Sequence, residues 1–206
     1  MRFATMALVC LATAAQADTA DLPALHDVTG VAADDELQVR SGPSANDTPV
    51  TTLAPDARSV EVVSLSEDGK WANVNAGETS GWVATRFLAA QPDTAWWQGN
   101  VPLHCLGTEP FWGIGLNLAE KTAVYSALDG IDKPMSIDRV WTHFYNFPAS
   151  ATVGIRFADR NAFATLQAET CSDGMSDRSY GIAIDLFLTD DENLDLGWSG
   201  CCTITP

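Results

Sequence analysis

The sequence has few basic residues. It contains 11 Lys and Arg against 27 Asp and Glu, which gives a formal net charge of −16, and the basic residues form no cluster along the chain. Proteins that bind nucleic acid or anionic lipid depend on such clusters. The composition therefore predicts no nucleic-acid partner, and the acidity itself indicates solubility and not a particular function.

Long hydrophobic runs are also missing. Arg2 precedes a short apolar run at 6–12, and Ala15-Gln16-Ala17 has the A-x-A pattern of a signal cleavage site. A membrane span needs roughly 20 apolar residues. The sequence therefore predicts a signal peptide at 1–17, a periplasmic or secreted mature chain, and no transmembrane segment after cleavage. A lipoprotein anchored through Cys10 is the alternative, although the residue before Cys10 is larger than lipidation requires.

Only four cysteines follow the predicted cleavage site, namely Cys105, Cys171, Cys201 and Cys202. An even number in an exported chain indicates two disulfides. A bond between the adjacent Cys201 and Cys202 would close a strained eight-membered ring, so Cys105 and Cys171 should each pair with one of them, in an order left open. The alternatives are a redox-active vicinal pair or a zinc site, and the sequence lacks the close C-x-x-C pairs typical of zinc.

Helical periodicity is absent, whereas strand patterns recur throughout. In the first part of the chain they lie at 36–40, 50–53, 59–64, 71–74 and 82–84, with a D-G hairpin turn at Asp68-Gly69. Five short strands with tight turns predict a small β-barrel. In the second part, apolar residues alternate at 114–118, 122–126, 153–157, 164–168, 182–188 and 194–198, which predicts a mostly antiparallel sheet or barrel with one buried face. The expected fold class is all-β.

These patterns divide the chain into five parts. We expect a signal peptide at 1–17, a flexible lead-in at 18–35, a small barrel at 36–90, a linker at 91–100 and a cysteine-containing β domain at 101–206. Trp96-Trp97 in the linker should pack on one of the domains, with a carbohydrate platform as the alternative.

The small barrel resembles a bacterial SH3 domain of the SH3b or SH3_3 type. The resemblance rests on Leu37-x-Val39-Arg40-Ser41-Gly42-Pro43-Ser44, on Gly69-x-Trp71-x-x-Val74, and on Gly81-Trp82-Val83 with Phe87-Leu88. Gln38 and Asp56 stand where the family often has Asn and Gly. The resemblance implies binding to peptidoglycan or to a peptide. Our candidate ligand-binding residues are Arg40, Trp71 and Trp82, although both tryptophans could instead fill the core.

The second domain resembles a family of uncharacterised bacterial envelope proteins. The matching stretches are Cys105-Leu106-Gly107-Thr108-Glu109-Pro110-Phe111-Trp112, Cys171-Ser172-Asp173-Gly174-Met175-Ser176-Asp177-Arg178-x-Tyr180 and Gly200-Cys201-Cys202. Relatives of that family occur beside lipoprotein-type β domains of the lysozyme-inhibitor or META kind, with no established activity. Glu109, Asp173, Asp177 and Arg178 are candidates for a polar site, and a loop that satisfies its own backbone is the alternative.

Enzyme signals are weak. Gly197-Trp198-Ser199-Gly200-Cys201 nearly spells a nucleophile elbow, but its last position is not glycine and no helix follows. A cysteine nucleophile would need a free thiol beside His104 or His143. The acidic residues at 190–192 with Asp195 could hold Ca²⁺, but their spacing does not match an EF-hand loop. The aromatic segment at 141–147 predicts a strand with Trp141, His143, Tyr145 and Phe147 on one face. That face is either buried against the sheet or forms a binding surface.

The sequence thus predicts an exported, non-enzymatic envelope protein without a metal or cofactor. Its partner would be peptidoglycan, or an envelope protein or peptide, bound through the SH3-like barrel. The alternatives are an inhibitor or accessory subunit that grips a cell-wall enzyme through the second domain, and a cell-wall hydrolase.

Overall fold

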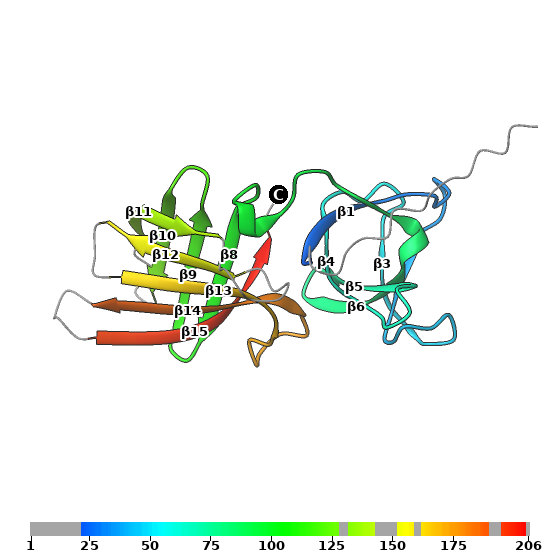
Figure 1. Cartoon of the computed structure of the whole chain (residues 1–206). Coiled ribbons are helices and arrows are strands. Elements are labelled where there is room, and N and C mark those ends of the chain that lie inside the picture. The colour runs from blue at the N-terminus through cyan, green and yellow to red at the C-terminus, as the bar shows by residue number, and fades with distance from the viewer. Residues whose placement is uncertain (1–21, 128–131, 143–151, 159–161, 190–194, 205–206) are drawn as a thin grey trace, which may run out of the picture.

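The protein consists of two β domains side by side (Figure 1). The computed structural model describes residues 22–127, 132–142, 152–158, 162–189 and 195–204. The predicted signal peptide at 1–17, the side chains of His143, Tyr145 and Phe147, and the acidic turn at 190–192 lie outside the described residues. Within them the regular elements are β-strands and short 3-10 helices, which confirms the all-β prediction.

The first domain is a seven-stranded antiparallel sheet with the strand order β3-β2-β6-β5-β4-β1-β7. Its strands are β1 (Ala24–Val28), β2 (Leu37–Arg40), β3 (Pro49–Leu53), β4 (Val60–Leu65), β5 (Trp71–Ala76), β6 (Thr79–Ala84) and β7 (Leu88–Ala90), and the 3-10 helix η2 (Thr85–Phe87) joins the last two. The alternating apolar residues predicted from the sequence point inward, and Val39, Val74 and Val83 are completely buried.

The expectation of a flexible lead-in at 18–35 is wrong for β1. This strand pairs with β4 on one side and with β7 on the other. Val28 packs into the core of the first domain, whereas Leu25 belongs to the core of the second domain. Because its two apolar residues are buried by different domains, β1 shows no alternating pattern that would identify it from the sequence.

The second domain is a closed eight-stranded barrel. Each strand pairs antiparallel with the next along the chain, and the last pairs with the first. The strands are β8 (Leu103–Thr108), β9 (Phe111–Asn117), β10 (Thr122–Ala127), β11 (Asp132–Trp141), β12 (Thr152–Phe157), β13 (Ala162–Cys171), β14 (Tyr180–Thr189) and β15 (Asp195–Ile204). Closure leaves no sheet edge exposed, and large apolar side chains fill the interior.

Two disulfides tie the barrel together at β15. Cys105 is bonded to Cys202, its register partner on the neighbouring strand, and Cys171 is bonded to Cys201. The prediction that Cys105 and Cys171 would each take one of the adjacent cysteines is therefore confirmed, and the pairing is resolved.

The linker is not free between the domains. It contains the 3-10 helix η3 (Trp96–Gln98), in which Trp96 is completely buried in the barrel core and Trp97 packs against it. The expectation that the tryptophan pair packs on one domain is confirmed. The barrel thus holds the end of the linker as part of its own structure.

Hydrogen bonds join the two domains directly. The side-chain amide of Asn75 on β5 accepts from the Ser179 N–H at 3.1 Å and donates to the Ser179 carbonyl at 2.9 Å. The Ser80 N–H of β6 donates to the Asp177 carbonyl at 3.0 Å. The barrel loop that follows Cys171 is therefore docked on the β5–β6 hairpin of the first domain.

A buried carboxylate completes this interface. Glu61 of β4 is only 6% exposed, and its two carboxylate oxygens accept hydrogen bonds from the Ile204 N–H at 3.0 Å and from Asn75 Nδ2 at 3.1 Å. Ile204 ends β15, so Glu61 ties the end of the last barrel strand to the first domain. Burial raises the pKa of Glu61, against the opposing effects of its two hydrogen bonds and the nearby Arg178 guanidinium.

Candidate functional site: a groove on the first domain

A groove of about 320 Å³ lies on the outer side of the first domain. Strands β2, β5 and β6, the last two residues of η2, the segment before β2 and the loop after β2 supply its walls. The lining residues are Gly30, Val31, Ala32, Asp35, Glu36, Leu37, Gln38, Arg40, Ala45, Trp71, Ala84, Arg86 and Phe87. We call this set the groove.

Two of the three predicted ligand-binding residues line the groove. Trp71 and its register partner Ala84 contribute to its wall, as does Arg40. Trp82 is the register partner of Arg40 but does not line the groove. The structure therefore brings Arg40 and Trp71 together and places Trp82 beside them on the sheet.

Arg40 also has a structural task. Its guanidinium donates to the Asp47 carbonyl at 2.7 Å and to Gln38 Oε1 at 2.5 Å. The Ser41 N–H donates to the Thr48 carbonyl at 2.9 Å and closes the same loop. Because these contacts hold the guanidinium in place, its positive charge is presented to the groove from a fixed position.

An aromatic ring and a second cation also line the groove. Phe87 lines the groove, and the Arg86 guanidinium lies 4.5 Å from the centre of its ring, which is within cation–π distance. The Thr29 N–H donates to the Phe87 carbonyl at 2.9 Å, and this fixes the end of η2 against the segment that leads to β2. Arg86 itself is exposed and free to meet a ligand.

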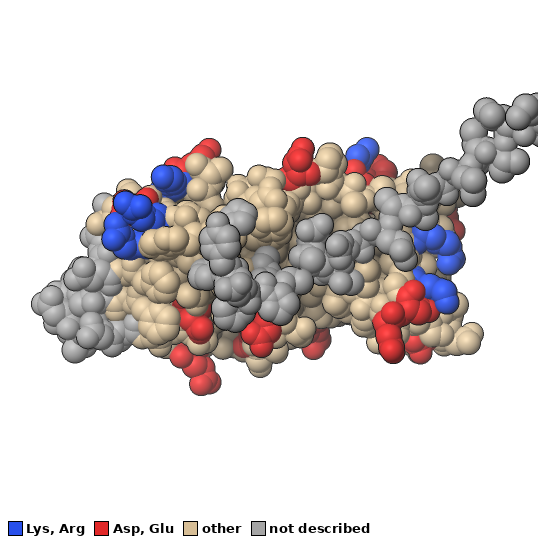
Figure 2. All heavy atoms as spheres, in the orientation of Figure 1, with Lys and Arg blue, Asp and Glu red and all other residues tan. Residues whose placement is uncertain are grey.

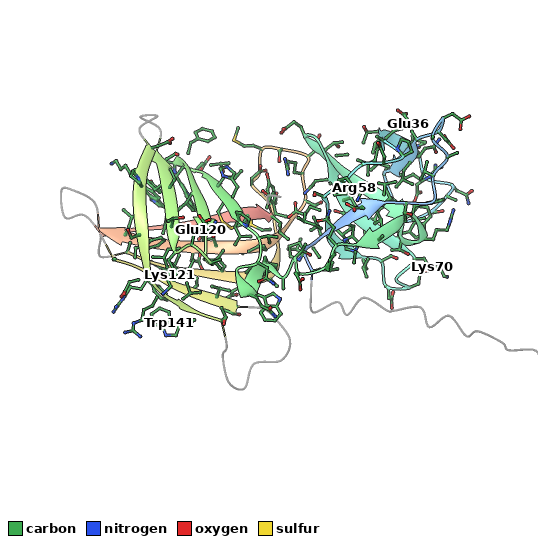
Figure 3. The ribbon with its side chains drawn as sticks, turned by 90° about the horizontal axis from the view of Figure 1, so that it is seen from above. Glu36, Arg58, Lys70, Glu120, Lys121 and Trp141 are labelled. Atoms are coloured by element: carbon green, nitrogen blue, oxygen red, sulfur yellow. A yellow bond between two sulfur atoms is a disulfide. The ribbon has the colours of Figure 1, made fainter. Side chains whose placement is uncertain are left out.

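Acidic side chains form the remaining rim. Asp35 and Glu36 line both the groove and an adjoining hollow of about 520 Å³, which Asp34 also lines. Figure 3 shows Glu36 on the side of the first domain that faces away from the barrel. The groove therefore offers aromatic surface together with both cations and carboxylates, a lining suited to a ligand that carries both charges.

The predicted polar loop of the barrel is organised differently. Burial of the Asp173 carboxylate opposes its ionisation, but hydrogen bonds from the Met175 and Ser176 N–H groups and from the Ser176 and Tyr180 hydroxyls outweigh burial and hold its pKa at about 2. Asp173 thus satisfies groups of its own loop.

The other members of that loop do not converge on one site. Asp177 pairs with the first domain through its main chain, and Glu109 is exposed at a turn. The Arg178 guanidinium lies 5.9 Å from the centre of the Tyr180 ring, on the interface side near Glu61. This geometry supports domain docking more than ligand binding.

The weak enzyme signals gain no catalytic geometry. Ser199, the middle residue of the elbow-like sequence, lies within β15 and donates to Asp185 Oδ1 at 2.7 Å. All four cysteines of the barrel are disulfide-bonded, so none offers a thiol to His104. No group of three or more His, Cys, Asp or Glu that could hold a metal occurs among the residues that the structure describes.

Sequence reasoning missed the acidic residues, the second cation and the second aromatic residue of the groove. Asp35, Glu36, Arg86 and Phe87 line the groove but were absent from the predicted site. One signal could have indicated them. The pair Arg86-Phe87 follows shortly after β6, and the acidic pair Asp35-Glu36 directly precedes β2. This signal acquires meaning only when the fold brings the two segments together.

Comparison with known families identifies the region around the groove. Residues 35–89 match the family of bacterial SH3 domains, so the sequence resemblance is confirmed for this segment. The match spans β2 to β7 and leaves β1 and the barrel unmatched. No curated protein matches the chain. Among the described residues, no helix has the length and apolar character needed to cross a membrane.

Proposed function

We propose that this protein is a non-enzymatic binding protein of the bacterial cell envelope, and that the groove of its SH3 domain binds the stem peptides of peptidoglycan. The observation that carries the proposal is the charge arrangement of the groove. Its lining combines the aromatic rings of Trp71 and Phe87 with the cations Arg40 and Arg86 and with the carboxylates of Asp35 and Glu36.

Stem peptides fit this arrangement chemically. They carry free carboxylates and, on their diamino acid, an amino group. Guanidinium groups bind carboxylates through charge-assisted hydrogen bonds, and the acidic rim can receive the amine. Aromatic side chains supply the apolar contact area that a short extended peptide needs for measurable affinity.

The disulfides support a location outside the cytoplasm. Disulfides form and persist in oxidising compartments such as the periplasm, and the barrel contains two. Together with the SH3 domain they fit an envelope protein. Export through cleavage after Ala17 is part of the proposal.

The proposal is tested by calorimetric titration of the full chain with purified, glycan-free stem tetrapeptide. Arg86→Gln and Trp71→Ala should each weaken binding at least tenfold, because each removes one side of the groove. Val50→Ala is the matched control, since Val50 is 47% exposed on the same domain and does not line the groove. Equal affinity of the wild type and both groove variants would refute the assignment.

A further inference from the structure

The outer wall of the barrel carries a row of large side chains across four neighbouring strands. Arg139 of β11 is the register partner of Arg156 of β12, which faces Phe163 of β13, which in turn faces Phe187 of β14. Register partners project from the same face of a sheet. The adjacent residues along β12 to β14 are buried in the barrel, so this row points outward.

The aromatic members of the row are unusually exposed. Phe163 is 39% exposed and Phe187 is 50% exposed. Trp141, at the end of β11, is 42% exposed, and its ring lies 6.4 Å from that of Phe163 in a tilted arrangement. Several large aromatic side chains exposed together on one face mark an interaction surface.

Glycines keep these rings accessible. A Cβ atom on Gly154 would lie 3.4 Å from the Trp141 ring and 3.7 Å from the Phe163 ring. Gly197 of β15 is the register partner of Phe187, and a Cβ atom there would lie 3.3 Å from the Phe187 ring. Larger side chains at either position would cover the rings that the glycines leave open.

The row ends in an unbalanced pair of cations. Like charges directly opposite one another destabilise a sheet, yet Arg139 faces Arg156 here. Asp138 pairs with Arg156. Within the described part of the chain, the Arg139 side chain forms no ion pair or hydrogen bond. Figure 2 shows Lys and Arg side chains gathered at this end of the barrel, and Figure 3 places Lys121 on the same side as Trp141.

The exposed apolar surface is a narrow strip. Trp141 belongs to the next row, in which it pairs with Gly154, and that row continues into the polar residues Thr165 and Asp185. The apolar strip is therefore two rows wide only at β11. With strands about 4.8 Å apart, the row from Arg139 to Phe187 spans roughly 14 Å. A narrow apolar strip of this length suits an extended polymer chain. The broad face of a bilayer would also have to contact the polar side chains of Thr165 and Asp185.

We propose that this row, composed of Arg139, Arg156, Phe163 and Phe187, forms together with the adjoining Trp141 a binding surface for a glycan strand that carries carboxylates. The C–H faces of the sugar rings pack on the aromatic rings, where many weak dispersion contacts add up. The Arg139 guanidinium binds a carboxylate of the strand, and Arg156, which is paired with Asp138, stands beside it. This surface lies on a different domain from the groove and does not depend on it.

The test uses the full chain and peptidoglycan glycan strands whose stem peptides have been removed by an amidase, so that each lactyl group ends in a free carboxylate. In calorimetric titration, Phe187→Ala and Arg139→Gln should each weaken binding at least tenfold. Phe111→Ala is the matched control, because Phe111 is 49% exposed on β9, outside the row. Trp71→Ala should bind the strands like the wild type, which separates this surface from the groove.

Absence of wild-type binding to the peptide-free strands would overturn the proposal, as would equal binding by the wild type and both row variants. Binding to vesicles of anionic phospholipid that both row variants lose, without binding to the strands, would also overturn it and assign the row to a membrane surface. The midpoint of urea unfolding should be unchanged in each variant, because the substituted side chains point outward. An unchanged midpoint excludes misfolding as the cause of weaker binding.

Discussion

Glu61 should make the stability of the protein depend on pH in a direction opposite to that of most carboxylates. The side chain is 6% exposed, and burial raises its pKa from the ordinary value of 4.5. A raised pKa means that the folded state binds a proton more tightly than the unfolded state does. The stabilising contribution is therefore complete below pH 4.5 and is lost as the pH rises through the folded-state pKa.

The magnitude has two parts. Each unit by which the pKa is raised corresponds to about 1.4 kcal/mol between the protonated and ionised forms. The hydrogen bonds act in the other direction. Glu61→Ala leaves the Ile204 N–H and one N–H of Asn75 without their acceptors, and each orphaned donor costs about 1–3 kcal/mol. Removal of the buried charge offsets part of this cost. We expect Glu61→Ala to lower the free energy of unfolding by about 2 kcal/mol at pH 7.

Glu61→Gln separates charge from hydrogen bonding. Its carbonyl oxygen can still accept from Ile204, but its amide would place a donor opposite Asn75 Nδ2, which already donates to Ser179. We therefore expect this variant to be less stable than the wild type at low pH, with the difference shrinking as the pH rises above 4.5.

The assay is urea unfolding of the wild type, both Glu61 variants and the control Glu67→Gln, at intervals between pH 4 and 8. Glu67 is exposed in the turn before β5 and should change nothing. If the free-energy difference between the wild type and Glu61→Gln stays constant over this range, Glu61 is not held in a charge-disfavouring site and the reasoning is refuted.

Three further predictions concern the barrel. Gly200→Ala should lower the unfolding free energy by several kcal/mol, because its Cβ would overlap a facing main-chain carbonyl, whereas Gly115→Ala meets nothing within 4 Å and should cost less than about 1 kcal/mol, as measured by urea unfolding. Asp173→Asn should loosen its loop and speed amide exchange there. The wild-type Asp173 contribution is present above pH 3.8 and is lost only as the pH falls through about 2, so unchanged exchange at pH 7 would contradict its role. Replacing Cys171 and Cys201 by serine removes a link between residues 30 apart in the chain and should cost about 3 to 4 kcal/mol; an unchanged thermal midpoint would show that the link adds no stability.

Alternating apolar residues predicted much of the fold. The five strands expected in the first domain and the clear alternation along β14 appear where the pattern indicated. Strand β11 was missed over most of its length. Its register shifts between Ile137 and Arg139, and Pro134 interrupts the pattern. A β-bulge moves later side chains to the opposite face, so a strict period of two cannot identify such a strand.

The candidate site was only partly predictable. Arg40 and Trp71 could be named because they belong to recognisable family motifs. The acidic rim and Arg86 become neighbours only through tertiary folding. The exposed row on the barrel was also out of reach, since alternation indicates that Phe163 and Phe187 share a face with Arg156 only once the register of three strands is known. Sequence periodicity gives the face of one strand and not the pairing between strands.

The central claim, that the SH3 groove binds stem peptides, is tested most directly by NMR titration of the isotopically labelled full chain with glycan-free stem tetrapeptide. Peptide binding in the groove should change amide and indole shifts around Gly30, Glu36, Trp71 and Phe87 and leave them constant at the Asn75–Ser179 contact between the domains. Shift changes centred on that contact or on the barrel, with the groove signals unmoved, would contradict it.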